Sequence, residues 1–493
     1  MPPSGGDDIT SSNGFSDVAT VYHRTEILLA ASGPALHNGG PAGLLWSMVW
    51  TYVGQLFVTL SLAEMASMAP TSAAHCHCKY PRLVSGVSEL APPHWQRFLS
   101  YLTGWLACFG WQSVTAVYCY NIAGTIHGLI QLNHPSYVPE AWHLMLLIAA
   151  TAVVVSATRI LFSNRLSLLE GAYAVLHVYA FVLVAITLWV LAPHPSGESV
   201  LTHYHNGGAW PNTGLSIPTG QITSIFVWLR SDSVAHLAEE VENAAQVVPK
   251  SIIYGYLING PLGLILAVTI LFCFGSPGEE APGPPSAWPY IGLFHRALGN
   301  PTATTAFVIV VLVLLAMTTL SVTAVSSRVM LALARDNGLP LSPHLRHTRH
   351  TNPTIALSAT LTLALSLLTL CLSAPAAFHT VLALATACLT STYIICLACI
   401  LRKRARGEAL PHAQWSLGGR AGLGVNVLGL GYAAWAFFWC LWPAEYVVTA
   451  GNFNWAPVLL LVLVGVACVS FVDGVGTSYH GPVARVQTWM SAW

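Results

Sequence analysis

The chain has 493 residues, of which 54% are hydrophobic and only 8% are Asp, Glu, Lys or Arg, and its formal net charge is zero. A soluble domain carries about 25% charged residues, so this composition excludes a soluble globular protein and predicts an integral membrane protein. A chain without net charge produces no long-range field that would attract nucleic acid, and we expect no nucleic-acid partner.

The first predicted helix is unusual. Residues 1–26 are polar and lack the apolar core of a signal peptide, so we expect them to form a cytoplasmic tail that is not cleaved. The apolar stretch from Ile27 to Leu36 then holds about ten residues before the polar run 37–40, which is half of a membrane-spanning helix. We therefore expect the first helix to be atypical or incomplete.

Eleven later stretches are long and apolar enough to span a bilayer. With the first helix they predict an all-α integral membrane protein of about twelve transmembrane helices. The membrane domain is expected over residues 27–475 and a cytoplasmic C-terminal tail over 476–493. The eleven stretches lie at 43–63, 98–131, 141–160, 166–192, 218–240, 251–275, 303–333, 353–373, 378–401, 423–442 and 455–473.

The positions of Lys and Arg support twelve crossings. If both ends of the chain are cytoplasmic, sixteen of the nineteen basic residues fall in cytoplasmic segments. The outer loops then carry Arg296 together with acids such as Glu140 and Glu445, as the positive-inside rule requires. The outer loops 194–217 and 276–302 are rich in Gly, Pro and Trp, and we expect them to form ordered caps.

The eleven cysteines lie mostly inside apolar runs, as at Cys108, Cys388 and Cys440. That placing is typical of small packing residues and not of a disulfide framework. Two cysteines alternate with histidines at His75-Cys76-His77-Cys78, but adjacent alternation lacks the ligand spacing of structural zinc. We expect no metal site there and interpret the segment as an insertion.

Ionisable groups interrupt the predicted span 218–240, which contains Asp232, His236, Glu239 and Glu240. Removing such a group from water costs several kcal/mol unless it is paired, so a charge at membrane depth is a functional hypothesis. Asp232 would bind a substrate ammonium, carry a proton, or cap the N-terminus of a half-helix. His236 would relay a proton or lie hydrogen-bonded inside the bundle.

The predicted span 166–192 contains a second group of this kind. Glu170 and His177 are seven residues apart and therefore lie near one face of the helix. They would belong to a proton path, or they would form an internal hydrogen-bonded cluster with Tyr173.

Five segments resemble the signatures of fungal amino acid/choline/GABA permeases, a group within the amino acid, polyamine and organocation transporter superfamily. They occur in the expected order, and the resemblance covers roughly residues 26–485. The segments are Gly39-Gly40-Pro41-Ala42-Gly43-Leu44, Ser61-Leu62-Ala63-Glu64-Met65-Ala66-Ser67-Met68-Ala69-Pro70-Thr71, Ser88-Glu89-Leu90-Ala91-Pro92-Pro93, Ala235-His236-Leu237-Ala238-Glu239-Glu240-Val241-Glu242-Asn243-Ala244 and Ala334-Arg335-Asp336-Asn337-Gly338-Leu339-Pro340.

The resemblance implies a twelve-helix fold in which helices one to five and six to ten form inverted repeats and two helices follow. In such folds helices one and six are broken near mid-membrane, and their half-helix ends present dipoles and free backbone groups to the substrate. Ser231 to His236 would lie at or just past the break in helix six, with Glu26 opposite on helix one. Glu239 and Glu240 resemble the family's acidic pair at the inner end of helix six and would form a cytoplasmic gate contact with Lys250 or with a basic loop residue.

Two features depart from the family pattern. Arg24-Thr25-Glu26 stands near the expected break of helix one, where a charge costs about 2.5–3.5 kcal/mol at the membrane centre. Arg230 precedes Ser231 and Asp232 where the family has a glycine and an aromatic residue. Arg230 would pair with Asp232 or Glu26, or it would bind a substrate carboxylate with both guanidinium arms.

These observations predict a secondary active transporter for a small nitrogenous solute such as an amino acid, GABA, choline or a polyamine, working by proton-coupled alternating access. The alternative is a non-transporting nutrient sensor or an inactive paralogue that keeps the permease fold, which the altered first helix and Arg230 favour. We expect no enzyme, because neither a nucleophile with a base nor a usable set of metal ligands is visible. The expected partners are the solute, protons and the lipid bilayer, with no cofactor. The plasma membrane is the expected location, with the vacuolar membrane as the alternative.

Overall fold

A computed structural model describes residues 25–68, 87–162, 166–229, 231–236, 243–273, 288–347, 354–371 and 377–479. Within these ranges the chain is helical and contains no β-strand, which confirms the all-α part of the predicted fold class. The helices are α2 (Thr25–Ala31), α3 (Gly33–His37), α4 (Gly40–Met68), α6 (Gln96–Asn133), α7 (Ala141–Leu161), α8 (Leu166–Leu191), α9 (Gly197–Thr202), α10 (Thr213–Gly220), α11 (Ile222–Trp228), α12 (Ser233–His236), α13 (Ala244–Cys273), α14 (Pro289–Leu298), α15 (Pro301–Arg335), α16 (Ser342–Leu345), α17 (Thr354–Cys371), α18 (Ala377–Ala405), α19 (Arg420–Cys440), α20 (Ala456–Ser470), the π-helix η3 (Phe471–Val475) and α21 (Gly476–Ser478).

Eight helices among the described residues are long and apolar enough to cross a membrane. They are α4, α7, α8, α13, α15, α18, α19 and the run from α20 to α21. The helices α6 and α17 occupy two further predicted spans, and a group of short helices, α10 to α12, occupies the span predicted at 218–240. Within the described residues each of the eleven predicted stretches contains helix, with helical structure interrupted in the stretch 218–240, while the number of crossings and the repeat architecture stay predictions.

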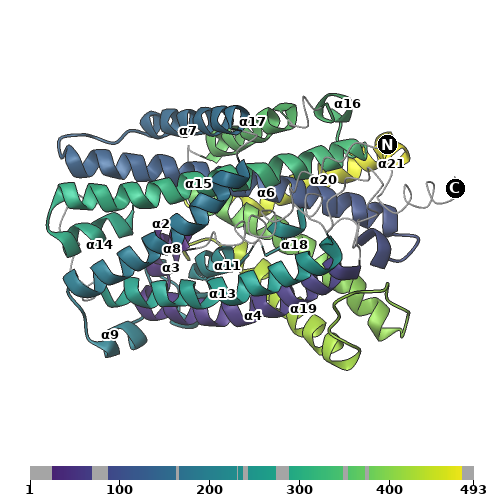
Figure 1. Ribbon diagram of the computed structural model, residues 1–493, viewed down its shortest axis with the longest axis horizontal. Helices are drawn as coiled ribbons and strands as arrows, with labels where there is room; N and C mark the ends of the chain where they lie inside the picture. The colour runs from purple at the N-terminus through teal and green to yellow at the C-terminus, as the bar shows by residue number, and fades with distance from the viewer. Residues whose placement is uncertain are drawn as a thin grey trace, which may run out of the picture.

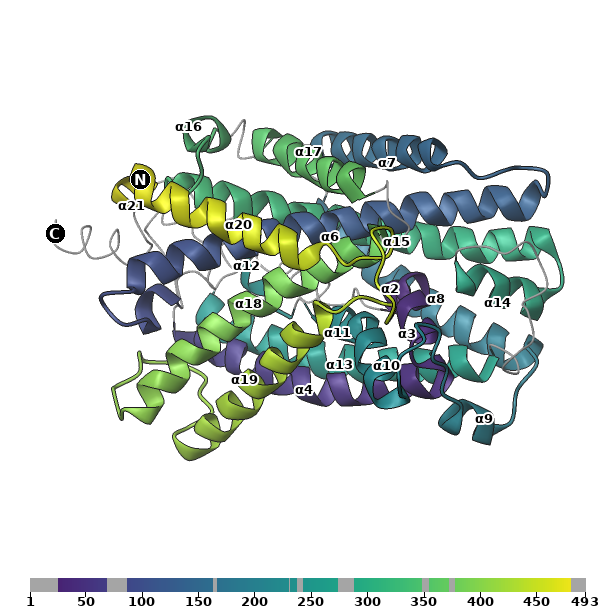
Figure 2. The ribbon, with the colours of Figure 1, turned by 180° about the vertical axis from the view of Figure 1, so that it is seen from behind.

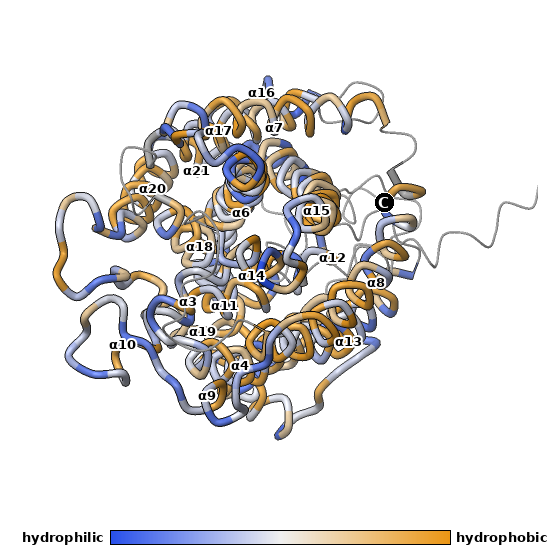
Figure 3. Tube along the Cα trace, turned by 90° about the vertical axis from the view of Figure 1, so that its left-hand side faces the viewer, coloured by the Kyte–Doolittle hydropathy of each residue, from blue (hydrophilic) through white to orange (hydrophobic). Residues whose placement is uncertain are grey.

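The long helices run side by side along one axis (Figure 1). Viewed along that axis, α6, α15 and α18 lie in the interior of the bundle, while α4, α8, α13, α7, α17 and α20 lie around them (Figure 3). The helix α6 packs against both α15 and α18, and α4 packs against α13 and α19. Large apolar side chains cover the outer helices, with Leu161 76% and Val472 82% exposed, as a lipid-facing surface requires.

One end of the bundle is rich in basic residues. Arg335 ends α15, Arg402 to Arg404 lie in the last turn of α18, and Arg420 begins α19. Figure 2 shows α16, α21 and the connection between α18 and α19 at this end, with α9 and α14 at the opposite end. We call it the basic end. It is the end that the positive-inside rule assigns to the cytoplasm.

The opposite end is closed by ordered segments, as predicted for part of the two outer loops. The helix α14 lies inside the loop predicted at 276–302, and its Tyr290 hydroxyl is 2.7 Å from the Thr125 hydroxyl of α6. A segment of the other loop lies against the start of α4, where His205 N–H donates to Gly39 O. Gly40 has φ +65°, and a Cβ there would lie 2.7 Å from His205 N, so this motif position requires glycine.

Two sequence predictions are corrected or tested by this architecture. The helical segment predicted to begin at 218 begins at Thr213, because the Asn212 side chain accepts a hydrogen bond from Leu215 N at 3.0 Å and caps a polar first turn that hydropathy does not detect.

The eight cysteines whose side chains the structure describes are free thiols, and seven of them are buried. Their packing role is thereby confirmed for the described part of the chain.

Candidate functional site

The helix that contains the ionisable segment is interrupted. The helix α11 ends at Trp228, Leu229 is extended with φ −63° and ψ 170°, and helical structure resumes only at Ser233. The segment from Ser231 to His236 therefore lies at and just past a break, as predicted. The Ser231 hydroxyl accepts a hydrogen bond from the Thr59 hydroxyl of α4 at 3.0 Å, which ties the break to a long neighbouring helix.

A second discontinuity lies beside it. The helices α2 and α3 are separated at Ser32, just before Pro34, which lacks a backbone N–H and cannot continue the hydrogen-bonding pattern. Both helices pack against α11. The break predicted near Arg24-Thr25-Glu26 falls at the limit of the described residues, because α2 begins at Thr25.

Asp232 is buried inside the bundle, with a relative exposure of 1%. One carboxylate oxygen, Oδ1, accepts a hydrogen bond from the Tyr393 hydroxyl of α18 at 2.6 Å, and Oδ2 lies 3.1 Å from His236 Nε2. The pair Asp232 and His236 is spaced i, i+4, so both side chains lie on one face of the short helical turn. The described contacts of this carboxylate are thus with side chains, and not with the N–H groups of α12 that an N-cap would satisfy.

His236 presents an unused ring nitrogen. Because Nε2 faces the Asp232 carboxylate, hydrogen bonding favours the tautomer that carries its proton on Nε2, which leaves a lone pair on Nδ1 in the neutral ring. Within the described chain, His236 Nδ1 is buried and has no hydrogen-bond partner, and the same holds for the indole N–H of Trp111. The two rings meet edge to face at 5.7 Å. This arrangement leaves one acceptor and one donor open to a polar ligand.

Glu26 belongs to a different cluster. Its Oε1 accepts a hydrogen bond from the Thr318 hydroxyl of α15 at 2.6 Å, and its Oε2 lies 3.6 Å from His177 Nδ1 of α8. The Tyr173 hydroxyl lies 2.9 Å from that of Thr318, and all four side chains are buried. The structure thus places His177 and Tyr173 in an internal hydrogen-bonded cluster with Glu26, while the proton path stays a prediction. Glu170 of the same helix is only partly buried.

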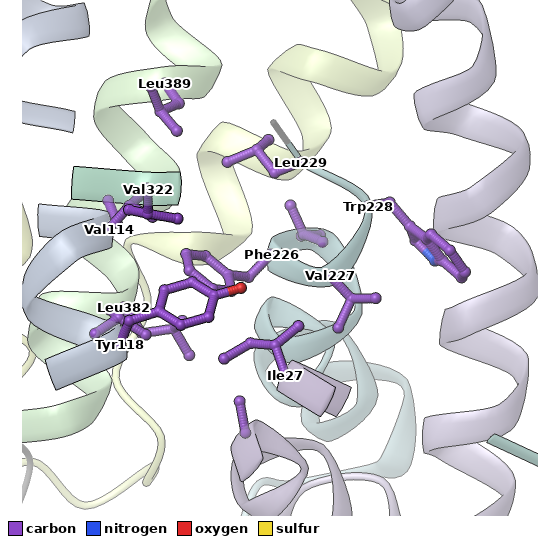
Figure 4. Packing of buried hydrophobic residues seen from close by; sticks show 14 of the residues in the cluster. Ile27, Val114, Tyr118, Phe226, Val227, Trp228, Leu229, Val322, Leu382 and Leu389 are labelled. Atoms are coloured by element: carbon purple, nitrogen blue, oxygen red, sulfur yellow. The ribbon is translucent and has the colours of Figure 1, made fainter. Parts of the chain in front are cut away.

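Apolar side chains fill the space before the break. Figure 4 shows Ile27 of α2, Tyr118 of α6 and Phe226 of α11 gathered beside one another, ahead of Leu229. All four belong to the main hydrophobic cluster. A solute held at the break would therefore contact Asp232 and its polar partners on one side and these apolar side chains on the other.

Several predicted residues lie outside the described residues. These are Arg230, Glu239 and Glu240, so the pairing of Arg230 and the gate contact with Lys250 stay predictions. The segment His75-Cys76-His77-Cys78 also lies outside them. Among the side chains that the structure describes, no group of three or more His, Cys, Asp or Glu residues could hold a metal ion.

Sequence reasoning missed the partners of the acidic groups. Tyr393 and Thr318 lie in strongly apolar helices without any nearby charge, and Trp111 lies in an apolar stretch that contains several other aromatic residues. Local composition therefore carries no signal for these partners.

Known proteins that resemble this chain are consistent with its membrane architecture. The model of a family described as amino acid permease matches residues 15–464. A putative amino acid/polyamine transporter of Macrophomina phaseolina is 28% identical over 425 residues, which cover 85% of this chain and 91% of that protein. Amino-acid permease 2 of Neurospora crassa is 24% identical over 456 residues, or 91% and 81% of the two chains. A choline transporter of Saccharomyces cerevisiae is 23% identical over 434 residues, or 86% and 74%.

Proposed function

Because the chain belongs to the amino acid permease family, we propose that it is a secondary active transporter that moves a small nitrogenous solute across the membrane by alternating access. Membership of the family and the apolar helices make it a membrane transporter for amino acids or related solutes. The names of its relatives point to an amino acid, a polyamine or choline, and GABA belongs to the same chemical class. The plasma membrane is the proposed location.

The break in helix six carries this proposal. A carboxylate buried at an interrupted helix has lost its water, and its partners in the described chain are a phenol and an imidazole. An ammonium group of a solute would find at Asp232 the strong acceptor that such a cation needs. The helix α11 also ends at this point, and backbone groups at such a break bind solutes in broken-helix transporters.

Coupling to protons is a second part of the proposal. Asp232 and His236 share one hydrogen bond through His236 Nε2. A proton accepted at Nδ1 would leave that hydrogen bond intact. A protonated Nδ1 becomes a hydrogen-bond donor that can bind the carboxylate of a solute such as an amino acid or GABA. Binding of the proton and binding of the solute would then favour each other, as uptake driven by an outside proton requires.

The contacts of the two acidic residues also support the proposed inverted repeats. Numbered from α2, Glu26 of helix one contacts helix five (α8) and helix eight (α15). Asp232 of helix six contacts helix ten (α18), and its partner His236 contacts Trp111 of helix three (α6). Exchanging the two five-helix repeats turns one, five and eight into six, ten and three. The two clusters are therefore related in the way that a twelve-helix fold with inverted repeats requires.

Uptake measurements test the proposal. Cells that express this chain would be given a labelled panel of choline, GABA, amino acids and polyamines at two outside pH values, beside cells that express Asp232→Asn. We expect uptake of one class, stimulated by acid outside pH, and its loss in Asp232→Asn at equal amounts of protein in the membrane. Absence of uptake by wild-type protein that reaches the membrane would contradict transport and favour the non-transporting sensor or inactive paralogue.

A further inference from the structure

A third buried carboxylate lies at the basic end, away from both acidic clusters. Glu64 is in the last turns of α4, and its side chain has no exposed surface. Its Oε1 accepts three hydrogen bonds: from Arg404 Nη2 at 2.7 Å, from the Ser416 hydroxyl at 2.8 Å and from Leu417 N at 2.9 Å. All three donors belong to the end of α18 and to the connection that leads from α18 to α19.

Arg404 is fixed from several sides. Its side chain is 7% exposed, and besides Glu64 it donates to the side-chain oxygen of Asn426 in α19 and to Gly418 O. The Asn426 amide donates in turn to the Ser61 hydroxyl of α4 at 2.8 Å. One guanidinium group therefore joins the ends of three helices, α4, α18 and α19. A buried charge pair with this many additional hydrogen bonds is held in one geometry.

The connection between α18 and α19 also contacts an apolar cluster that includes residues of helix six. Trp415 N donates to the Ser67 hydroxyl of α4 at 2.9 Å, and the Trp415 side chain packs against a small apolar cluster. That cluster contains Val234 and Ala235 of α12, together with Ala63 of α4 and residues of α13. The short helix that carries His236 and the segment that Glu64 holds in place thus share one apolar cluster.

We propose that Glu64 and Arg404 form a latch that holds residues 415–417 over α12 and so controls the opening of the basic end during transport. The proposal rests on the proposed transport function, because opening of this end is a step of alternating access. For α12 to become accessible, the 415–417 segment must leave the end of α4. The segment's two hydrogen bonds to Glu64 Oε1, from Ser416 and Leu417, and its bond from Trp415 N to Ser67 are the interactions that this movement breaks. Glu64 and Arg404 are positioning residues that need not touch the solute.

A pair of glycines in α19 offers a mild way to disturb the latch. A Cβ added at Gly422 would lie 2.4 Å from Arg404 Nη2, so Gly422→Ala must displace the guanidinium group. A Cβ added at Gly424, two residues further on, meets no atom within 4 Å, and Gly424→Ala serves as the matched control. Glu64→Gln removes the charge itself and provides a second test of the same contact.

Accessibility of α12 would be measured with Ser233→Cys as reporter, using a membrane-impermeant maleimide on inside-out and right-side-out vesicles. The same chain without Ser233→Cys corrects for the native cysteines. We expect Gly422→Ala and Glu64→Gln to raise the labelling rate about tenfold or more in inside-out vesicles, as the loss of one hydrogen bond to a charged group predicts, and Gly424→Ala to leave it unchanged. If a transported solute has been found, the maximal rate should change more than KM.

Equal labelling of Gly422→Ala and Gly424→Ala would overturn the proposal, as would faster labelling in right-side-out vesicles only. Should Glu64→Gln fail to reach the membrane, the comparison of the two glycine variants still decides the result. Labelling requires no transported solute, so a failure of the proposed function, seen as absent uptake, is distinguishable from a failure of the latch.

Discussion

Asp232 and Glu64 are both fully buried carboxylates near helix ends, yet their partners differ in kind. Asp232 accepts hydrogen bonds from a tyrosine hydroxyl and a histidine ring. Glu64 accepts them from a guanidinium group, a hydroxyl and a backbone N–H. A guanidinium group keeps its charge at every physiological pH, whereas an imidazole changes its charge near neutrality. The Asp232 carboxylate therefore has no permanently charged partner among its described contacts, whereas the Glu64 carboxylate is paired with one.

The difference fits the two roles proposed above, a transport site at Asp232 and a latch at Glu64. A transport site must bind and release, so its carboxylate needs partners that are neutral or titratable and that a solute can replace. A joint that closes one end of a bundle needs a fixed charge pair whose breaking is costly. Glu26, with a threonine hydroxyl and His177 as partners, resembles Asp232 in this respect.

The largest expected effect comes from breaking the fixed pair. Arg404→Met leaves Glu64 buried without its cation, and we expect a loss of about 3–5 kcal/mol in unfolding free energy, because removing one member of a buried ion pair strands the other. The neighbouring Arg402 is the control: it lies 3.8 Å from Glu408 with side chains 31% and 40% exposed, and such pairs contribute about 1 kcal/mol or less. Thermal unfolding of the purified proteins in detergent measures both. Equal melting temperatures for Arg404→Met and Arg402→Met would show that the pair is not a joint.

A smaller effect is expected at the cluster around Asp232, and it should fall mainly on transport and less on stability. Tyr393→Phe removes the hydroxyl donor to Asp232 Oδ1, and a buried acceptor that loses its donor costs about 1–3 kcal/mol. If that cost falls on solute binding or on the transport step, uptake at low solute concentration decreases about tenfold for each 1.4 kcal/mol.

Tyr290→Phe is the matched control for this measurement. It also removes a buried hydroxyl with a 2.7 Å contact, to Thr125, but at the end where α14 packs and away from Asp232. Uptake per molecule in the membrane should decrease for Tyr393→Phe alone. A similar decrease in both variants would mean that loss of any buried tyrosine hydroxyl impairs the protein, and that the Asp232 cluster has no special role.

The contrast between local and distant signals explains what the sequence could predict. The helices follow from apolar runs, because a bilayer imposes their length, and Asp232 and His236 were found because charges are rare in such runs. Their partners were not found: Tyr393 is 161 residues from Asp232, Thr318 is 292 from Glu26, and Arg404 is 340 from Glu64. Contacts of that separation leave no trace in local composition. The motif around Glu64 was recognised by resemblance, but the motif alone does not identify the residue that pairs with it.

The smallest effect is expected at Glu89, a carboxyl group of the basic end outside the membrane-spanning helices. Burial raises the pKa of Glu89, and the charge of Lys403, whose ammonium donates to Glu89 O at 3.1 Å, partly opposes that rise. A raised pKa means that the folded protein binds the proton more tightly than the unfolded chain does. The contribution of Glu89 to stability is then full below its unfolded pKa and is lost as the pH rises through its folded pKa.

Glu89→Gln removes this dependence, and at neutral pH we expect it to change the unfolding free energy by about 0.5 kcal/mol or less. Carboxyl groups with a raised pKa titrate between about pH 4 and about pH 8. Melting temperatures of the two proteins across this range test whether Glu89 loses its stabilising contribution as the pH rises. A wild-type protein that gains stability relative to Glu89→Gln with rising pH would show that Lys403 outweighs burial, so that Glu89, like Glu64, acts as a fixed partner of a basic residue.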